Sequence, residues 1–117
     1  GHSLGGVMAA KYASENSNIK GVIFYASYPQ GDELKDSNIE VTSIYGSLDG
    51  VADLEKIIGS KDLLPTSTTF VEITGGNHAQ FGSYGEQSGD NPAEISADEQ
   101  IEKAANASIE LLDKISK

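Results

Sequence analysis

Short runs of apolar residues, rich in β-branched and aromatic side chains, recur along the chain with polar or helix-forming segments between them. Three of these runs, at residues 20–26, 40–46 and 68–74, predict strands. The first is continuously apolar from Val22 to Ala26, which is typical of a parallel strand buried on both faces. We therefore expect these strands to form the centre of the fold.

Helical patterns fill the intervals between the predicted strands. Residues 7–13 combine small and helix-compatible side chains, and residues 54–64 carry a second helical pattern that stops at Pro65. Helix and strand thus alternate along the chain. This order predicts an α/β fold in which helices flank a parallel sheet on both faces.

The last part of the chain predicts a long loop followed by a long helix. Residues 77–92 are polar and rich in glycine, and loops of this length are often functional. Ser96 and Glu99 have the spacing of a capping box at a helix start. An apolar stripe at helical spacing makes the helix amphipathic. The stripe consists of Ile101, Ala104, Ala105, Ile109, Leu112 and Ile115.

Charge and composition narrow the possible partners. The 117 residues include eighteen acidic and eight basic ones, all of the latter lysine, and the net charge of −10 repels nucleic acids and anionic membranes. No apolar run reaches the roughly 18 residues of a membrane-spanning helix. Cysteine is absent, which excludes thiol nucleophiles and disulfides. We expect a soluble domain without nucleic-acid or membrane contacts.

The chain opens directly on Gly1-His2-Ser3, with no methionine and no element before it. We expect residues 1–117 to be one partial domain of a longer protein, whose preceding strands cover the open edge of the sheet. An export signal would also stand in that preceding part, so cytoplasmic and exported locations both stay open. The oligomeric state is open as well.

Gly1-His2-Ser3-Leu4-Gly5 has the G-x-S-x-G spacing of a nucleophile elbow, directly before a predicted helix. A serine on so sharp a turn has a strained backbone, and side chains two residues to either side would collide, which favours glycine at both places. The following helix directs backbone N–H groups at the reacting centre, and the Leu4 N–H is the expected oxyanion donor. By itself, the spacing also fits an ordinary turn at a helix start.

A serine hydroxyl needs a base to remove its proton, and the chain has two histidines. His78 stands in the loop after a predicted strand, where the catalytic base of an open α/β sheet belongs. His2 adjoins Ser3 and is expected to point away from the serine side chain, as a packed neighbour. We predict His78 as the general base; the alternative is a solvated loop histidine.

The base in turn needs a carboxylate to orient it. Asp49 follows the second predicted strand directly, which gives the chain order serine, acid, histidine known for hydrolases with an open α/β sheet. Asp53 is an alternative, although its position favours a cap for the helix that follows it. Asp32 and Glu33, after the first predicted strand, are further alternatives.

Neither a metal nor a cofactor is implied by the residues. The two histidines lie far apart in the sequence, and no carboxylate cluster has the spacing of metal ligands. The glycine turns lack the lysine of a phosphate-binding loop. We therefore expect chemistry that uses side chains alone.

Taken together, these segments resemble the α/β-hydrolase superfamily, and within it the small bacterial hydrolases related to dienelactone hydrolases and carboxylesterases. The loop around His78, residues 75–90, carries the most specific part of the resemblance and is called the histidine loop below. The matching segments are residues 1–6 (GHSLGG), residues 46–50 (GSLDG), the pair Leu64-Pro65, and residues 75–85 (GGNHAQFGSYG) followed by Gln87 and Asp90.

The resemblance implies the C-terminal half of a hydrolase fold that begins at the nucleophile. It implies a serine hydrolase of carboxylesterase type, which cleaves a carboxylic ester or related acyl bond through an acyl-enzyme. The loop that supplies the second oxyanion donor in this family precedes the nucleophile, and loss of one donor costs about a hundredfold or more in rate. We therefore expect the isolated fragment to be slow or inactive.

Two other functions are compatible with the same residues. The first is acyl transfer, in which an acceptor outcompetes water, and the second is a non-catalytic binding protein that kept the fold. For the enzyme, the short connection at residues 27–38 leaves little room for a lid and favours a small-molecule ester. Tyr28, Phe81 and Tyr84 are candidates for the pocket walls.

Overall fold

The computed structural model describes residues 1–116, whose centre is a three-stranded parallel sheet. Its strands are β1 (Gly21–Tyr25), β2 (Glu40–Gly46) and β3 (Thr69–Ile73), in that spatial order. The three predicted strands are therefore confirmed, each to within a residue at either end.

The middle strand, β2, is the most deeply buried element of the sheet. Its residue Ile44 lies beside Tyr25 of β1 and Val71 of β3, and is fully buried. Every residue of β2 after Glu40 is buried. A central parallel strand has helices over both faces, so both sets of its alternating side chains are removed from water.

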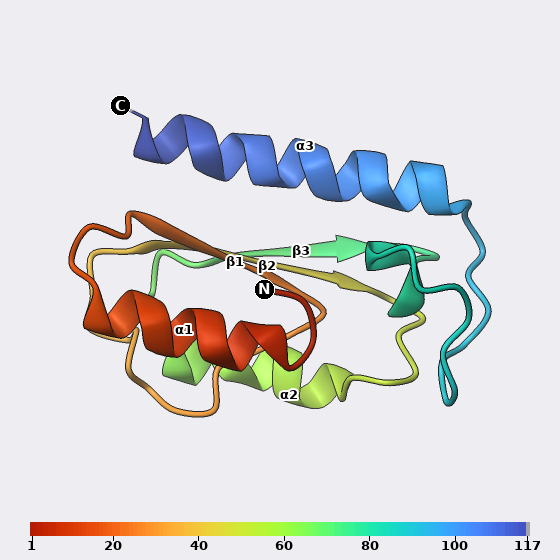
Figure 1. Cartoon of the computed structure of the whole chain (residues 1–117), viewed down its shortest axis with the longest axis horizontal. Coiled ribbons are helices and arrows are strands. Elements are labelled where there is room, and N and C mark those ends of the chain that lie inside the picture. The colour runs from red at the N-terminus through yellow and green to blue at the C-terminus, as the bar shows by residue number, and fades with distance from the viewer. Residues whose placement is uncertain (117) are drawn as a thin grey trace.

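Helices cover both faces of the sheet, as the sequence predicts. The helices α1 (Gly5–Glu15) and α2 (Leu54–Gly59) lie on one face, and α3 (Ala97–Ile115) runs across the other (Figure 1). The pattern at 54–64 is not one helix, because α2 passes into a short 3-10 helix, η1 (Ser60–Leu63). None of the helices in the described residues has both the length and the apolarity that a bilayer crossing requires.

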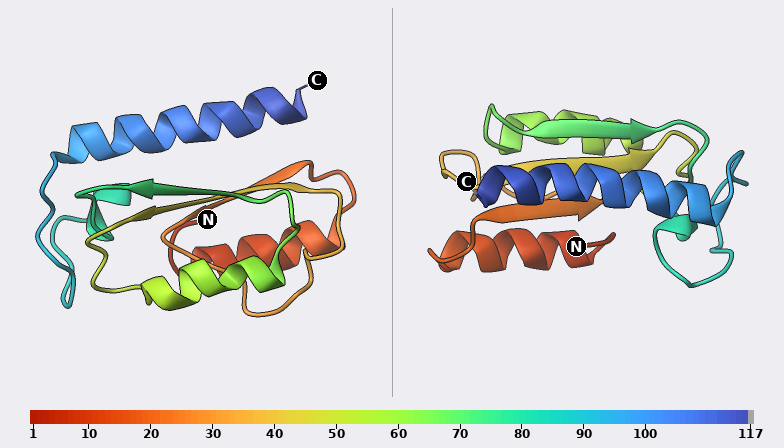
Figure 2. Two further views of the ribbon diagram at one scale, coloured as in Figure 1. Left: turned by 180° about the vertical axis from the view of Figure 1, so that it is seen from behind. Right: turned by 90° about the horizontal axis from the view of Figure 1, so that it is seen from above.

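Two hydrophobic clusters fill the space between the layers. Beneath α1 and α2, the buried cluster comprises Ala10, Ala13, Val22, Phe24, Leu34, Val41 and Leu64. Beneath α3, it comprises Ile44, Ile73, Ala104 and Ala107, with half-buried residues around it. Alternate residues of β1 point to opposite clusters, as the period of a strand requires. The views from behind and from above show the same layers (Figure 2).

The apolar stripe expected on α3 is wrong as a description of its packed face. Ile101, Ile109 and Leu112 are 47%, 52% and 50% exposed, and Ala105 is exposed as well. Of the predicted stripe, only Ala104 is buried. The residues that α3 buries are Gln100, Ala104, Ala107, Ser108 and Leu111.

Polar contacts explain this orientation of α3. The Gln100 side chain is fully buried because its amide bonds both backbone groups of Asn77, at 3.1 Å to the N–H and 2.7 Å to the carbonyl. Nearer the end of the helix, the Ser108 hydroxyl lies 2.6 Å from the Tyr25 hydroxyl of β1. Leaving such buried groups unpaired costs about 1–3 kcal/mol each, so these contacts favour the face that carries Gln100 and Ser108. Ser96 caps the helix by accepting the N–H of Glu99, which confirms the serine half of the predicted capping box, whereas the Glu99 carboxylate pairs with Lys103 at 3.1 Å.

Two adjacent leucines of α3 test this orientation. Leu111 is 3% exposed and would touch a Cβ built at Gly21 of β1, whereas Leu112 is half exposed. We expect Leu111→Ala to lower the free energy of unfolding by about 2–5 kcal/mol, through loss of burial and a new cavity. Leu112→Ala should change it by about 0.5 kcal/mol or less. Urea unfolding of both variants measures the difference; a larger loss in Leu112→Ala than in Leu111→Ala would mean that α3 packs through its predicted stripe.

Candidate active site

Ser3 lies on a sharp turn between an extended segment and a helix. Gly1 and His2 pair in parallel with the end of β1, where the Gly1 carbonyl accepts the N–H of Tyr25 at 2.9 Å. The Ser3 N–H then bonds the Tyr25 carbonyl at 3.1 Å, and the Ser3 carbonyl accepts the N–H of Gly6 at 3.0 Å. Between these bonds, Ser3 has φ +54°, a left-handed conformation that is costly for a residue with a side chain. The hydrogen bonds of the Ser3 N–H and carbonyl keep the residue in this strained conformation.

Two of the glycines around Ser3 are required by close packing. A Cβ at Gly1 would lie 2.6 Å from the Gly5 carbonyl oxygen, and one at Gly6 would overlap the Ser27 side chain. At Gly5, a Cβ would meet no group within 4 Å. The expectation that glycine is needed on both sides of the serine is therefore right for Gly1 and wrong for Gly5. Gly5 faces solvent, while Gly6 is buried against β1.

The Leu4 N–H is free to act as a hydrogen-bond donor. Within residues 1–116 no acceptor bonds it, because α1 begins one residue later. The Leu4 side chain is 74% exposed. On the other side of the turn, the buried Ser27 hydroxyl donates to the Ser3 carbonyl and so fixes the peptide that carries this N–H. Ser27 is a supporting residue that sequence reasoning missed.

His78 and Asp49 form a buried pair at the edge where the strands end. The His78 Nδ1 lies 2.7 Å from the Asp49 Oδ2, and their side chains are 2% and 0% exposed. Asp49 follows β2 and His78 follows β3, and neighbouring parallel strands end at one edge of the sheet. Because a carboxylate only accepts hydrogen bonds, Nδ1 is the donor, which leaves Nε2 for proton transfer. The structure thus brings together the predicted acid and base.

The second oxygen of Asp49 is bound by its own turn. Oδ1 accepts the N–H groups of Val51 at 2.8 Å and Ala52 at 2.7 Å. A buried carboxylate is tolerated only when its lone pairs are occupied. The turn after β2 therefore fixes the carboxylate and directs Oδ2 at the imidazole.

The alternative acids occupy other places. Asp53 caps α2 by accepting the N–H groups of Glu55 at 3.0 Å and Lys56 at 3.4 Å, the structural role that the sequence favours. Asp32 and Glu33 are exposed, and within residues 1–116 neither bonds a histidine.

His2 connects the serine turn to the histidine loop. Its ring stacks against Tyr84, and its Nδ1 lies 2.9 Å from the Tyr84 hydroxyl. The His78 ring lies 4.7 Å away between centroids. Burial, followed by the proximity of His78, lowers the pKa of His2, so that His2 is neutral at pH 7. In residues 1–116 no hydrogen bond joins the His78 ring to the Ser3 hydroxyl.

The three aromatic residues predicted as pocket walls are not equally placed. Phe81 lies 5.9 Å from the His2 ring, and Tyr84 contacts that ring while 58% exposed. Tyr28 is half-buried and makes no ring contact in the described part of the chain. A cavity of about 750 Å³ beneath the histidine loop is lined by loop residues and by the start of α3, and by none of the three.

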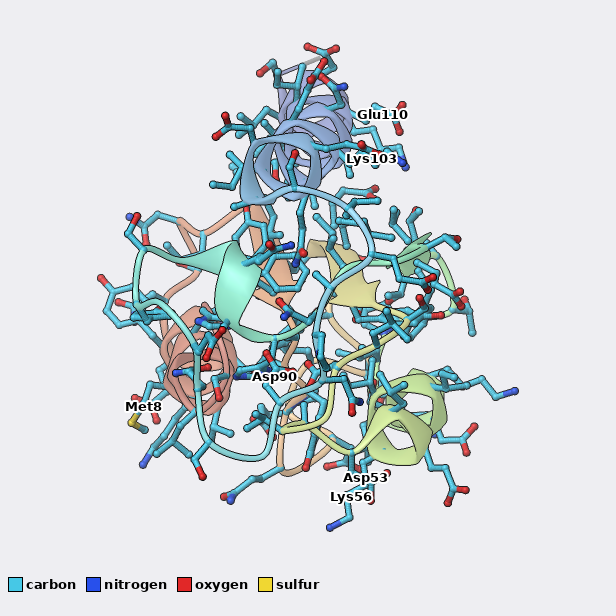
Figure 3. The ribbon with its side chains drawn as sticks, turned by 90° about the vertical axis from the view of Figure 1, so that its right-hand side faces the viewer. Met8, Asp53, Lys56, Asp90, Lys103 and Glu110 are labelled. Atoms are coloured by element: carbon cyan, nitrogen blue, oxygen red, sulfur yellow. The ribbon has the colours of Figure 1, made fainter. Side chains whose placement is uncertain are left out.

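Asp90 supports the site through backbone contacts. Its carboxylate accepts the N–H groups of Gly50 at 3.0 Å, His78 at 3.3 Å, Ala79 at 2.8 Å and Asn91 at 3.0 Å. Burial alone would raise the pKa of Asp90, but the four N–H groups outweigh it and hold this pKa below its usual value. Figure 3 faces the edge where the strands end, with Asp90 among its loops. The only signal for Asp90 in the sequence is its place in the family resemblance.

A comparison with models of known protein families identifies the family of this chain. A family model described as "Alpha/beta hydrolase family" matches residues 1–102, and the chain belongs to that family. The superfamily resemblance is thereby confirmed, whereas the relation to dienelactone hydrolases stays a prediction. The search of curated proteins gave no significant match. Among residues 1–116, no three histidine or carboxylate side chains are grouped so that they could hold a metal ion.

The depressed pKa of Asp90 makes a prediction about stability and pH. A lowered folded-state pKa stabilises the fold above the ordinary value of 3.8, and this stabilisation is lost as the pH falls through the folded-state value. We expect Asp90→Asn to lower the free energy of unfolding at about pH 7 by on the order of 1 kcal/mol, since part of the carboxylate reaches solvent. The gap between the two proteins should shrink in acid. Urea unfolding of both proteins, from about pH 7 down to below the ordinary pKa of 3.8, measures this difference in unfolding free energy. A difference that stays constant would contradict a lowered pKa for Asp90.

Proposed function

We propose that this α/β-hydrolase family member is a serine hydrolase of carboxylesterase type, with Ser3 as nucleophile, His78 as general base and Asp49 as the acid that orients it. The observation that carries the proposal is the buried pair of His78 and Asp49, 2.7 Å apart, together with a serine on a strained strand-to-helix turn whose neighbour His2 has its ring 4.7 Å from that of His78. Strain and buried charge both cost stability, and functional sites are where such costs are retained.

In the proposed reaction, the Ser3 hydroxyl attacks the acyl carbon of an ester while His78 Nε2 takes its proton. The negative charge that develops on the carbonyl oxygen is stabilised by the free N–H of Leu4. His78 then returns the proton to the leaving alcohol, and a water molecule activated in the same way releases the acid from the acyl-enzyme. Asp49 keeps the imidazole in the tautomer that this cycle needs. We propose that a second oxyanion donor comes from outside these residues.

The absence of a hydrogen bond between the Ser3 and His78 side chains in residues 1–116 is compatible with this mechanism. Hydrogen bonds to a nucleophile are often long or misaligned without substrate, and tighten only when substrate binds. The two side chains are linked through His2, whose backbone carries Ser3 and whose ring lies against His78. We propose that the histidine loop shifts when substrate binds and brings the base to the hydroxyl.

The substrate proposed is a small-molecule ester. The segment between β1 and β2 packs against the sheet through Pro29 and Leu34, both fully buried, so it is part of the core and no lid. Phe81 and Tyr84, beside His2, are the proposed apolar wall of the acyl site.

Covalent labelling tests the nucleophile. The natural full-length protein that contains this chain should react with a fluorophosphonate probe, and Ser3→Ala should abolish both labelling and hydrolysis of a short p-nitrophenyl ester. Ser83→Ala, at an exposed serine of the histidine loop, is the matched control and should keep both. A folded wild-type protein that takes up no probe would instead favour the non-catalytic binding protein.

A second substitution tests the acid. Asp49→Asn should reduce kcat by about 10⁴-fold. An amide at this position favours the wrong tautomer of the base, and it stabilises the imidazolium only poorly. Asp53→Asn is the control, since asparagine caps a helix about as well as aspartate, and kcat should change less than about twofold. Steady-state ester hydrolysis measures both. Equal losses in the two variants would remove Asp49 from its proposed role.

A further inference from the structure

Asp90 lies between the two segments that carry the proposed acid and base. Its Oδ1 accepts the N–H of Gly50 at 3.0 Å and that of His78 at 3.3 Å, and its Oδ2 accepts the N–H of Ala79 at 2.8 Å. Gly50 directly follows the acid Asp49, and the His78 N–H belongs to the base itself. One carboxylate thus holds the backbone on both sides of the 2.7 Å bond between Asp49 and His78.

This bridge matters because Asp49 and His78 come from separate segments. They stand 29 residues apart in the chain, on loops after different strands. The order of the strands brings the loops to one edge, but sets their spacing only to within the freedom of two loops. Hydrogen bonds to a charged acceptor are roughly twice as strong as neutral ones, so one carboxylate that accepts from both backbones restricts the spacing between them.

The packing around Gly50 indicates the same closeness independently of the hydrogen bonds. A Cβ at Gly50 would lie 2.5 Å from the Gly89 carbonyl oxygen and 3.0 Å from the Asn91 N–H. The turn that carries the acid is therefore pressed against the backbone on both sides of Asp90. The far end of this segment is anchored as well, because the Asn77 side chain donates to the Asn91 carbonyl at 2.8 Å.

We propose that Asp90 is a positioning residue of the active site, which sets the distance between Asp49 and His78 by binding the backbone of both segments. The inference rests on the proposed hydrolase function. It assigns to Asp90 no contact with substrate, and its effect passes through the alignment of the acid and base. A misplacement of about 1 Å can cost on the order of a hundredfold in rate.

The experiment is a time course of fluorophosphonate labelling with the natural full-length protein, and it separates two quantities. The fraction finally labelled reports how many sites are folded, and the rate constant of labelling reports how strongly each serine is activated. We expect Asp90→Ala to lower the rate constant by roughly 10- to 100-fold while labelling still goes to completion. Asp90→Glu, which keeps the carboxylate, should recover part of the rate. A normal rate constant with a reduced final fraction would overturn the proposal, since Asp90 would then be structural only.

Two further variants make the result specific. Asp53→Ala also removes a carboxylate that accepts two backbone N–H groups, but at the start of α2, and should leave the rate constant unchanged. Gly50→Ala should slow labelling in the same direction as Asp90→Ala, because its methyl group forces the acid turn away from residues 89–91. A Gly50→Ala protein that labels at the wild-type rate would contradict the bridge even if Asp90→Ala failed to fold.

A measurement without turnover separates this inference from the hydrolase proposal. The Nδ1 proton shared between His78 and Asp49 should give a low-field proton NMR signal, which Asp90→Ala shifts or broadens and Asp53→Ala leaves in place. If the wild-type protein takes up no probe, the hydrolase proposal fails, and the NMR signal alone decides whether Asp90 positions the pair. A signal that is identical in wild type and Asp90→Ala would overturn the positioning role.

Discussion

The contact on which the site depends is the buried hydrogen bond between His78 and Asp49. Removing a carboxylate from water costs several kcal/mol unless hydrogen-bond donors in the protein replace the lost hydration. Here two backbone N–H groups occupy one oxygen and the imidazole the other. The turn after β2 and the loop after β3 must therefore meet in one relative position, because any other leaves a buried charge unpaired. The local backbone around the site follows from that requirement.

The histidine loop shows how this position is maintained in a segment whose only regular structure among the described residues is a short 3-10 helix, η2 (Ala79–Phe81). A buried loop must find partners for backbone groups that no helix or strand satisfies. The Asn77 side chain accepts the N–H of Gln80 and donates to the Asn91 carbonyl. The side-chain amide of Gln100, on α3, bonds both backbone groups of Asn77. The Gln80 amide donates in turn to Gln100. The loop is thus tied to α3 on one side and, through Asp90, to the acid turn on the other.

The sequence predicted the features that depend on neighbours in the chain. The three strands, the Ser96 and Asp53 caps and the turn at Ser3 all follow from local propensity and spacing. Contacts between distant segments decided the rest. The packed face of α3 contradicts its apolar stripe because Gln100 turns inward toward a loop more than twenty residues earlier. Likewise, Gly6 is needed in place of Gly5 because Ser27 lies behind it, and no periodicity in the sequence reports that contact.

The two halves of the proposed site are held by different kinds of contact, and this difference bears on the proposed catalysis. Ser3 sits on a strained turn clamped by β1, by the start of α1 and by Ser27, so it has little room to move. His78 stands on a loop held by side chains, with Tyr84 joining that loop to His2 through one hydrogen bond at an exposed rim. In the proposed mechanism, the loop is therefore the part that moves to bring the base to the hydroxyl. Because the acid turn is bonded to the same loop through Asp90 and Asp49, a shift of the base would carry its acid partner with it, and the imidazole would stay oriented as it approaches the serine.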